Sequence, residues 1–190
     1  MKKKIFLLIL FIPATVYINA QNNKAQYRFH SINSLVLVNG WAGPAASIQS
    51  VNGFKKGRWF AGVGAGIDYY RYRTVPLFAD IRYEAGKKIN KFFAYANAGI
   101  NFTWVQDYLI IEPTIWNNNT SNDFKNGLYT DAGIGYSVGM KNENAFVLSL
   151  GYSQKNLSEI STYQWRSGEW FTTKNTYHLN RIMLKAGWKF

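Results

Sequence analysis

The segment 58–84, RWFAGVGAGIDYYRYRTVPLFADIRYE, alternates apolar residues with small or polar ones at every second position. The alternation runs from Trp59 to Tyr69 and resumes from Val75 to Tyr83 after the link RYRT. A period of two held over about ten residues is typical of a β-strand, because successive side chains of a strand point to opposite faces. The segment therefore predicts two long strands that pair as a β-hairpin.

The same period recurs along the chain and predicts eight strands, at 31–40, 43–53, 58–70, 75–86, 92–104, 128–140, 144–155 and 177–190. The links after the second, fourth and sixth strands are short, whereas the links 105–127 and 156–176 hold about twenty residues each. Outer-membrane barrels have short periplasmic turns on one rim and longer extracellular loops on the other. The pattern predicts an all-β fold, an eight-stranded antiparallel up-and-down transmembrane β-barrel with two long extracellular loops.

The N-terminus has the layout of a secretory signal peptide. Three lysines precede the apolar run 5–12, and the stretch ends at Ala20. We expect cleavage after Ala20, a periplasmic lead-in at 21–30 and the barrel at 31–190. The alternative, a membrane anchor, is disfavoured because eight apolar residues are too few to span a bilayer as a helix.

Composition supports a membrane barrel over a soluble enzyme. Aromatic residues make up 17% of the chain and charged residues 17%, with 16 Gly, 4 Pro and no Cys. The absence of Cys excludes disulfides, thiolate metal sites and Cys nucleophiles. The formal charge of +12 falls to 19 − 10 = +9 when the three leader lysines are removed. The remaining basic residues are spread over separate turns without a nucleic-acid-binding motif, which favours anionic lipid as their partner.

Alternation alone does not say which face meets lipid, because a lipocalin-like soluble barrel has the same period with its apolar face inward. Aromatic residues recur at both ends of the apolar face, and glycines occupy the other face, where an eight-stranded interior is narrow. Both features favour an apolar face that meets lipid. The predicted aromatic girdle comprises Trp59, Tyr69, Tyr83, Phe92, Phe102, Trp104, Tyr152, Trp188 and Phe190.

The opposite face collects charges. Unpaired charges in so confined a space are costly, so we expect them to pair into a network that plugs the lumen, with a gated or narrow conducting path as the alternative. The predicted network comprises Asp68, Asp80, Arg82, Glu84, Asp131, Arg181 and Lys185.

Two segments carry a resemblance to known proteins. The terminal strand RIMLKAGWKF, which ends in Phe190, resembles the C-terminal signal by which the barrel-assembly machinery recognises outer-membrane proteins. The block VNGFKKGRWFAGVGAGIDYYRYRTVPLFADIRY is similar to small, mostly uncharacterised outer-membrane β-barrel proteins of the Bacteroidota. The resemblance implies an OmpA/OmpX-like barrel without a peptidoglycan-binding domain, located in the outer membrane of a Gram-negative bacterium and assembled by that machinery.

The two long loops mix aromatic residues with Asn, Ser and Thr, a composition typical of adaptable recognition surfaces. The candidate recognition residues are Trp116, Tyr163, Trp165, Arg166 and Trp170. The loops could also pack together or touch lipid headgroups, and lipopolysaccharide phosphates are available to basic residues of this rim. An extracellular partner is not identified by the sequence.

Catalytic chemistry is not expected. His178 lacks the nearby serine that a lipid-acting hydrolase would need, and the chain has 2 His and no Cys, so neither a metal nor another cofactor is predicted. The leading hypothesis is a monomeric, non-enzymatic outer-membrane protein with a structural or surface-binding role. The alternatives are a small porin-like pore or transporter for minor solutes and, third, a lipid-modifying enzyme.

Overall fold

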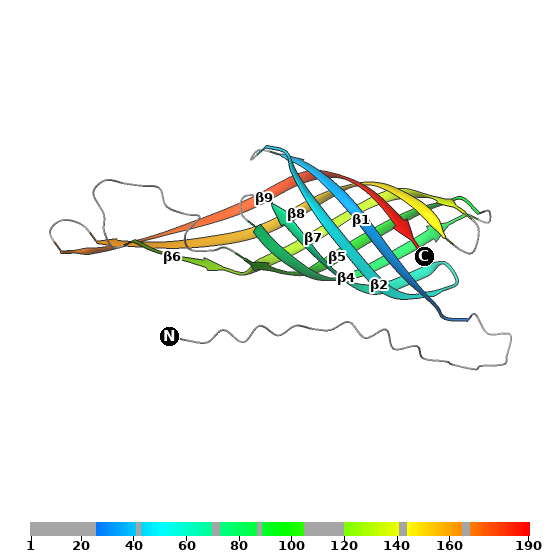
Figure 1. Cartoon of the computed structure of the whole chain (residues 1–190), viewed down its shortest axis with the longest axis horizontal. Helices are drawn as coiled ribbons and strands as arrows, with labels where there is room; N and C mark the ends of the chain where they lie inside the picture. Colours follow the sequence, from blue (N-terminus) through cyan, green and yellow to red (C-terminus); the bar gives the residue numbers. More distant parts are fainter. Residues whose placement is uncertain are drawn as a thin grey trace.

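The computed structural model describes residues 26–40, 43–69, 73–86, 89–104, 120–140, 144–164 and 168–190. The predicted signal peptide lies outside these residues. The described chain forms nine β-strands (Figure 1): β1 (Arg28–Gly40), β2 (Ala45–Lys56), β3 (Trp59–Tyr69), β4 (Arg73–Ala85), β5 (Lys91–Thr103), β6 (Thr120–Lys125), β7 (Gly127–Gly139), β8 (Ala145–Gln164) and β9 (Trp170–Lys189). Among the described residues, no helix is long and apolar enough to cross a membrane.

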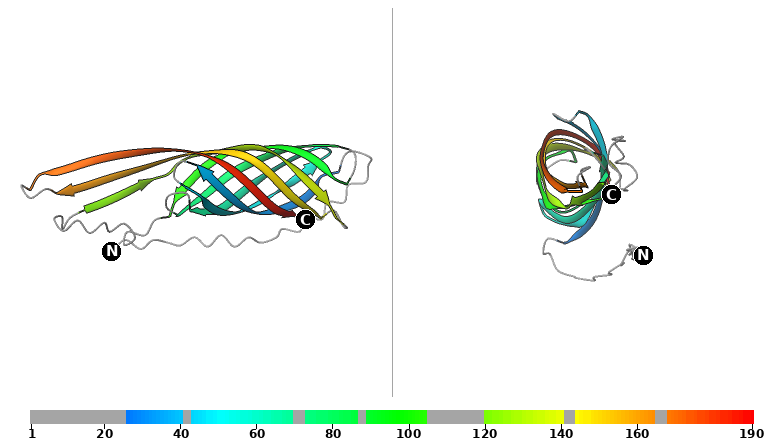
Figure 2. Two further views of the ribbon diagram at one scale, coloured as in Figure 1. Left: turned by 90° about the horizontal axis from the view of Figure 1, so that it is seen from above. Right: turned by 90° about the vertical axis from the view of Figure 1, so that its left-hand side faces the viewer.

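Eight of the strands form a closed antiparallel barrel. Each pairs with the next along the chain, β5 pairs with β7, and β1 pairs with β9 to close the ring. At one end of this closure the backbone N–H of Ser31 donates to the carbonyl of Phe190, and the N–H of Phe190 donates to Ser31, over 2.7 and 3.0 Å. Viewed along the long axis, the strands form a ring (Figure 2, right). The predicted eight-stranded antiparallel barrel is confirmed.

The ends of the barrel are distinct. We call the end at which β1 begins and β9 ends the lower mouth, and the opposite end the upper mouth. The strand β1 begins at Arg28, three residues before the predicted start, so residues 28–30 belong to the barrel and not to a lead-in. Its outward Leu35 and Leu37 alternate with inward Val36 and Val38, so both faces are apolar and the hydrophobic period is weak.

The predicted long loop over 156–176 is largely β-strand, so the predicted ends of the two flanking strands were wrong. The strands β8 and β9 each continue for 20 residues and stay paired from Ala145↔Lys189 to Gln164↔Trp170. Hydroxyl side chains face one another across this hairpin, with 3.4 Å between Ser158 and Thr176. Thr is enriched in strands because its branched side chain packs well on a pleated surface.

The other predicted loop, 105–127, contains β6. This strand pairs with β8 along the edge that β9 does not occupy. Residues 105–119 lie outside the described chain. We call β6 together with 156–164 of β8 and 170–178 of β9 the outer extension; it projects beyond the upper mouth (Figures 1 and 2). Its base is tied to the barrel because Thr103 donates its N–H to Asn126 and its hydroxyl to the carbonyl of Phe124, over 3.1 and 3.3 Å.

Glycines of the inner face make room for aromatic rings. Gly64 pairs with Phe78 across β3 and β4, and Gly135 pairs with Phe93 across β5 and β7. A Cβ atom on either glycine would overlap the opposite ring. The lumen therefore holds large side chains only because these strands leave them space, as expected for an eight-stranded barrel whose interior just fits its side chains.

We expect Gly64→Val to displace the Phe78 ring and to lower the free energy of unfolding by about 1–3 kcal/mol, the usual effect of overpacking. Ala65→Val is the matched control, because Ala65 lies on the outer face of the same strand. Urea unfolding in lipid vesicles would measure both. Equal effects of the two substitutions would contradict the steric role of Gly64.

Candidate functional site

The outer surface of the barrel is apolar and the interior carries the charges. The exposed aliphatic side chains of the wall include Leu35, Leu37, Ile48, Val63, Ile67, Leu77, Ile81, Ile100, Leu128, Ile134, Val138, Leu148, Leu150, Ile182 and Leu184. A barrel folded for water places its apolar side chains inside, whereas a membrane barrel alternates apolar-out with polar-in. The distribution in this chain is of the second kind.

Aromatic side chains gather at both ends of this apolar wall. Trp59 packs on Tyr83 with 4.9 Å between ring centroids near the lower mouth, and the guanidinium of Arg73 lies 4.1 Å from the ring centroid of Trp104 near the upper mouth. Of the nine predicted girdle residues, eight are exposed and Tyr83 is half-buried. Ten residues of a strand tilted by about 40° rise roughly 26 Å, close to the height of a membrane-barrel apolar band.

The upper part of the lumen holds an ion pair between β3 and β8. Asp68 accepts hydrogen bonds from the Lys155 ammonium and from the Thr74 hydroxyl, and the same ammonium lies 3.4 Å from the amide oxygen of Asn101. The side chains of Lys155 and Asp68 are 1% and 0% exposed. Their pairing across the lumen joins opposite walls near the upper mouth.

The middle of the lumen is crossed by a network centred on Asp131. This carboxylate accepts bonds from Lys185 (2.6 Å), Tyr129 (2.6 Å) and Asn97 (3.1 Å). Gln49 completes the network, because its amide nitrogen donates to the Tyr129 hydroxyl and its oxygen accepts from Lys185. The five residues come from β2, β5, β7 and β9, so the network links strands that are not neighbours.

A second middle pair lies within one strand. Arg82 donates to Asp80 through Nε and Nη2, with N–O distances of 2.8 and 2.9 Å. Its guanidinium lies 5.8, 5.7 and 5.6 Å from the ring centroids of Phe60, Phe93 and Tyr95. Aromatic faces attract a guanidinium electrostatically. The interior is therefore less purely polar than the sequence predicted, because aromatic rings fill the space between the ion pairs.

In the lower part of the lumen, several basic side chains share one carboxylate. Glu84 accepts hydrogen bonds from three lysines, Lys55, Lys91 (3.2 Å) and Lys189 (3.0 Å). Below this cluster lies an open cavity of about 640 Å³ at the lower mouth. Beside it, toward the barrel interior, the space between Phe60, Arg82 and Glu84 is only about 10 Å³, no more than the minimum that one water molecule needs.

The structure places all seven predicted network residues inside the barrel, but in separate contacts. Asp80 and Arg82 meet, whereas Glu84, two residues further along the strand, pairs with lysines, and Arg181 reaches the carbonyl of Gly43 over 2.8 Å. The sequence prediction missed cations that the structure places in these contacts: Lys55, Lys91, Lys155 and Lys189. Lys155 and Lys189 could have been found, because each continues the inward phase of its strand.

The outer extension holds two of the predicted loop-recognition residues. Trp170 is 59% exposed at the start of β9, and Tyr163 belongs to β8. Trp116, Trp165 and Arg166 lie outside the described residues. His178 is exposed and its Nδ1 lies 2.8 Å from the Asn156 amide oxygen. Within the described ranges, no three His, Cys, Asp or Glu side chains are grouped so as to hold a metal ion.

No protein-family model matches the chain, and no curated protein matches it. Among solved structures, the chain is similar to the solid-state NMR structure of the outer membrane protein AlkL in DMPC lipid bilayers, with a TM-score of 0.39 and 12% sequence identity. The similarity covers 91% of this chain and 92% of that chain. The architecture described above follows from the strand pairing of this chain and not from that likeness.

Lys155→Met is expected to lower the free energy of unfolding by about 3–5 kcal/mol, because it leaves the buried charge of Asp68 without its partner. The double substitution Asp68→Asn with Lys155→Met should recover part of that loss. Lys125→Met is the control, since the side chains of Lys125 and Asp123 are 53% and 60% exposed and such a pair contributes at most about 1 kcal/mol. Urea titration in vesicles compares the variants. A loss for Lys155→Met no larger than for Lys125→Met would contradict the role of the buried pair.

Proposed function

We propose that the chain is an integral outer-membrane β-barrel protein, closed along its lumen, which acts at the cell surface by binding a partner through its outer extension. The observation that carries the proposal is the extension itself. The strands β8 and β9 leave the barrel wall without interruption and present a three-stranded sheet with β6 beyond the upper mouth.

The membrane location is supported by the inverted polarity of the barrel and by the aromatic residues at both ends of its wall. A closed barrel leaves no edge strand in the membrane, so every backbone group of the wall finds a partner without water. The signal-peptide layout at 1–20 and the resemblance of RIMLKAGWKF to an assembly signal support export to the outer membrane of a Gram-negative bacterium. With the lower mouth, where β1 begins and β9 ends, on the periplasmic side, the extension lies outside the cell.

A binding role for the extension is supported by its side chains and by its edges. Trp170 and Phe171 are 59% and 43% exposed at its tip, beside the polar run Thr172, Thr173, Lys174 and Asn175. Among the described strands, β6 pairs with β8 alone, and β1 pairs with β9 only from Arg181 onward. Open strand edges can add an extended segment of another protein through main-chain hydrogen bonds. The favoured partner is therefore an extended protein segment, with lipopolysaccharide phosphates as neighbours at the rim.

A non-conducting lumen is supported by the crossing contacts of Asp68 with Lys155 and of Asp131 with Lys185. These contacts lie at two heights, and the aromatic rings of Phe60, Phe93 and Tyr95 surround Arg82 nearby. Opening a path would separate buried charges that are each other's partners, which is unfavourable by several kcal/mol. A structural or binding role is therefore favoured over a small pore.

In planar bilayers, we expect the unmodified protein to give no steady single-channel openings. The double substitution Asp131→Ala with Lys185→Ala removes the middle crossing and should increase the frequency of openings. Ile134→Ala with Leu184→Ala is the control, because both side chains are exposed on the outer wall of the same two strands. Steady openings of the unmodified protein would instead favour a small pore for minor solutes.

The absence of Cys allows a test of the extension with single introduced cysteines. Trp170→Cys should react in intact cells with a membrane-impermeant maleimide that carries a photo-cross-linker, and illumination should give an adduct with a surface protein. Lys56→Cys, at the end of β2 near the lower mouth, should react only after the outer membrane is permeabilised. Reaction of Lys56→Cys alone in intact cells would reverse the orientation, and labelling at 170 without an adduct would contradict the binding role.

A further inference from the structure

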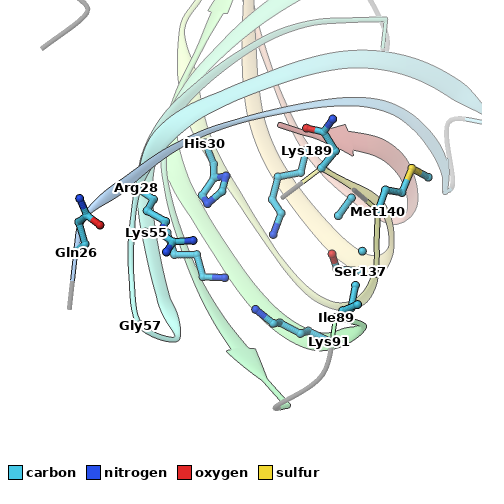
Figure 3. A pocket seen from close by; sticks show the side chains of 13 residues that line it. Gln26, Arg28, His30, Lys55, Gly57, Ile89, Lys91, Ser137, Met140 and Lys189 are labelled. Carbon is cyan, nitrogen blue, oxygen red and sulfur yellow. The ribbon is translucent and has the colours of Figure 1, made fainter. Parts of the chain in front are cut away.

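The lower mouth contains a cavity that the proposed surface role does not use. Its volume is about 640 Å³, within the range of about 300–1,000 Å³ that small-molecule sites occupy. Among the described residues that line it, Arg28, Lys55, Lys91 and Lys189 are basic and none is acidic. Figure 3 shows Lys55, Lys91 and Lys189 extending toward a shared space from three different strands.

Three lysines of this mouth share one carboxylate among the described residues. In the upper and middle lumen Lys155, Lys185 and Arg82 each have a carboxylate of their own. At the lower mouth Lys55, Lys91 and Lys189 share Glu84, so the charge of these four side chains is 3 − 1 = +2. Ammonium groups held close together repel one another, and an added anion would relieve that repulsion.

We propose that the lower mouth binds a phosphate-bearing anion with two or more negative charges. Each ammonium offers three hydrogen-bond donors, so the three lysines together exceed what the two oxygens of Glu84 can accept. A guanidinium recognises phosphate through paired hydrogen bonds, and lysines bind phosphate as point charges. Arg28, Lys91 and Lys189 supply both kinds of group around one cavity.

The rest of the lining sets the size and character of the ligand. Ser137 and Asn144 add uncharged hydrogen-bonding groups, whereas Ile89, Met140 and Ala145 form an apolar side. A cavity of about 640 Å³ is much larger than one phosphate ion, so it has room for an organic group or a second phosphate. Two sources offer this chemistry, a soluble phosphorylated molecule and the headgroup of a phospholipid in the adjoining leaflet.

The test is calorimetric titration of the whole protein with pyrophosphate in nanodiscs of phosphatidylcholine. Saturable binding to one site is expected. Arg28→Gln and Lys91→Gln should each weaken it about tenfold or more, as is usual for loss of a charged hydrogen-bond partner. Lys56→Gln should change the affinity less than about twofold. It removes the same charge near the same mouth, but its ammonium lies 3.1 Å from the Tyr27 hydroxyl and does not line the cavity.

Glu84→Gln provides a second measurement, because it removes the competing carboxylate and should strengthen pyrophosphate binding several-fold. No saturable binding, an equal loss in Lys56→Gln, or unchanged affinity in Glu84→Gln would overturn the proposal. Heat-dependent migration in gels, which reports the folded barrel, verifies that each variant is folded.

Repeating the titration in nanodiscs with phosphatidylglycerol separates the two sources of the ligand. Weakened pyrophosphate binding assigns the site to a lipid headgroup, and unchanged binding assigns it to a soluble phosphate. The result is independent of the extension, because Trp170 lies beyond the opposite mouth.

Discussion

The closure of β9 onto β1 is the interaction on which the rest of the structure depends. Lipid cannot hydrogen-bond to a strand edge, so a sheet that crosses a membrane needs each edge to be paired. The register from Ile32↔Lys189 to Gly40↔Arg181 supplies that pairing. Closure with eight strands also sets the width of the interior, and that width decides which side chains can lie inside.

The narrow interior explains why charge and glycine occur together on the inner face. A long basic side chain such as Lys155 or Lys185 can cross the lumen and reach a carboxylate on another strand. Aromatic rings occupy the remaining space, and glycine faces several of them, as with Gly64 and Phe78. Ion pairing and steric fit are thus two aspects of one packed core.

The sequence predicted the features that depend on the phase of a strand. Asp68, Asp131 and Lys185 fall on the inward phase, and the structure places them inside. Their partners could not be predicted, because strand tilt brings together residues such as Lys155 and Asp68, which are 87 positions apart. Phe93 and Tyr129 also fall on the inward phase, but the sequence did not show that their rings would fill the space between the ion pairs.

The outer extension escaped prediction for a related reason. Segments 156–164 and 170–178 are rich in Ser, Thr and Asn on both faces, so they lack the apolar period that marks a half-buried strand. The pairing of Ser158 with Thr176 and of Thr162 with Thr172 shows that the strands continue through cross-strand hydroxyl contacts without an apolar face. Hydrophobic periodicity identifies strands that pack on a core. These parts of β8 and β9 extend beyond the barrel and do not pack on one.

The uninterrupted course of β8 and β9 from wall to tip also bears on the affinity of any partner. Nine residues of strand beyond the barrel extend about 30 Å, so Trp170 is held at a defined height above the rim. A ribbon that continues the wall is already ordered before it meets a ligand. It therefore loses less conformational entropy on binding than a free loop of the same length would lose. The barrel thus acts as a rigid mount that sets the reach and orientation of the proposed binding surface.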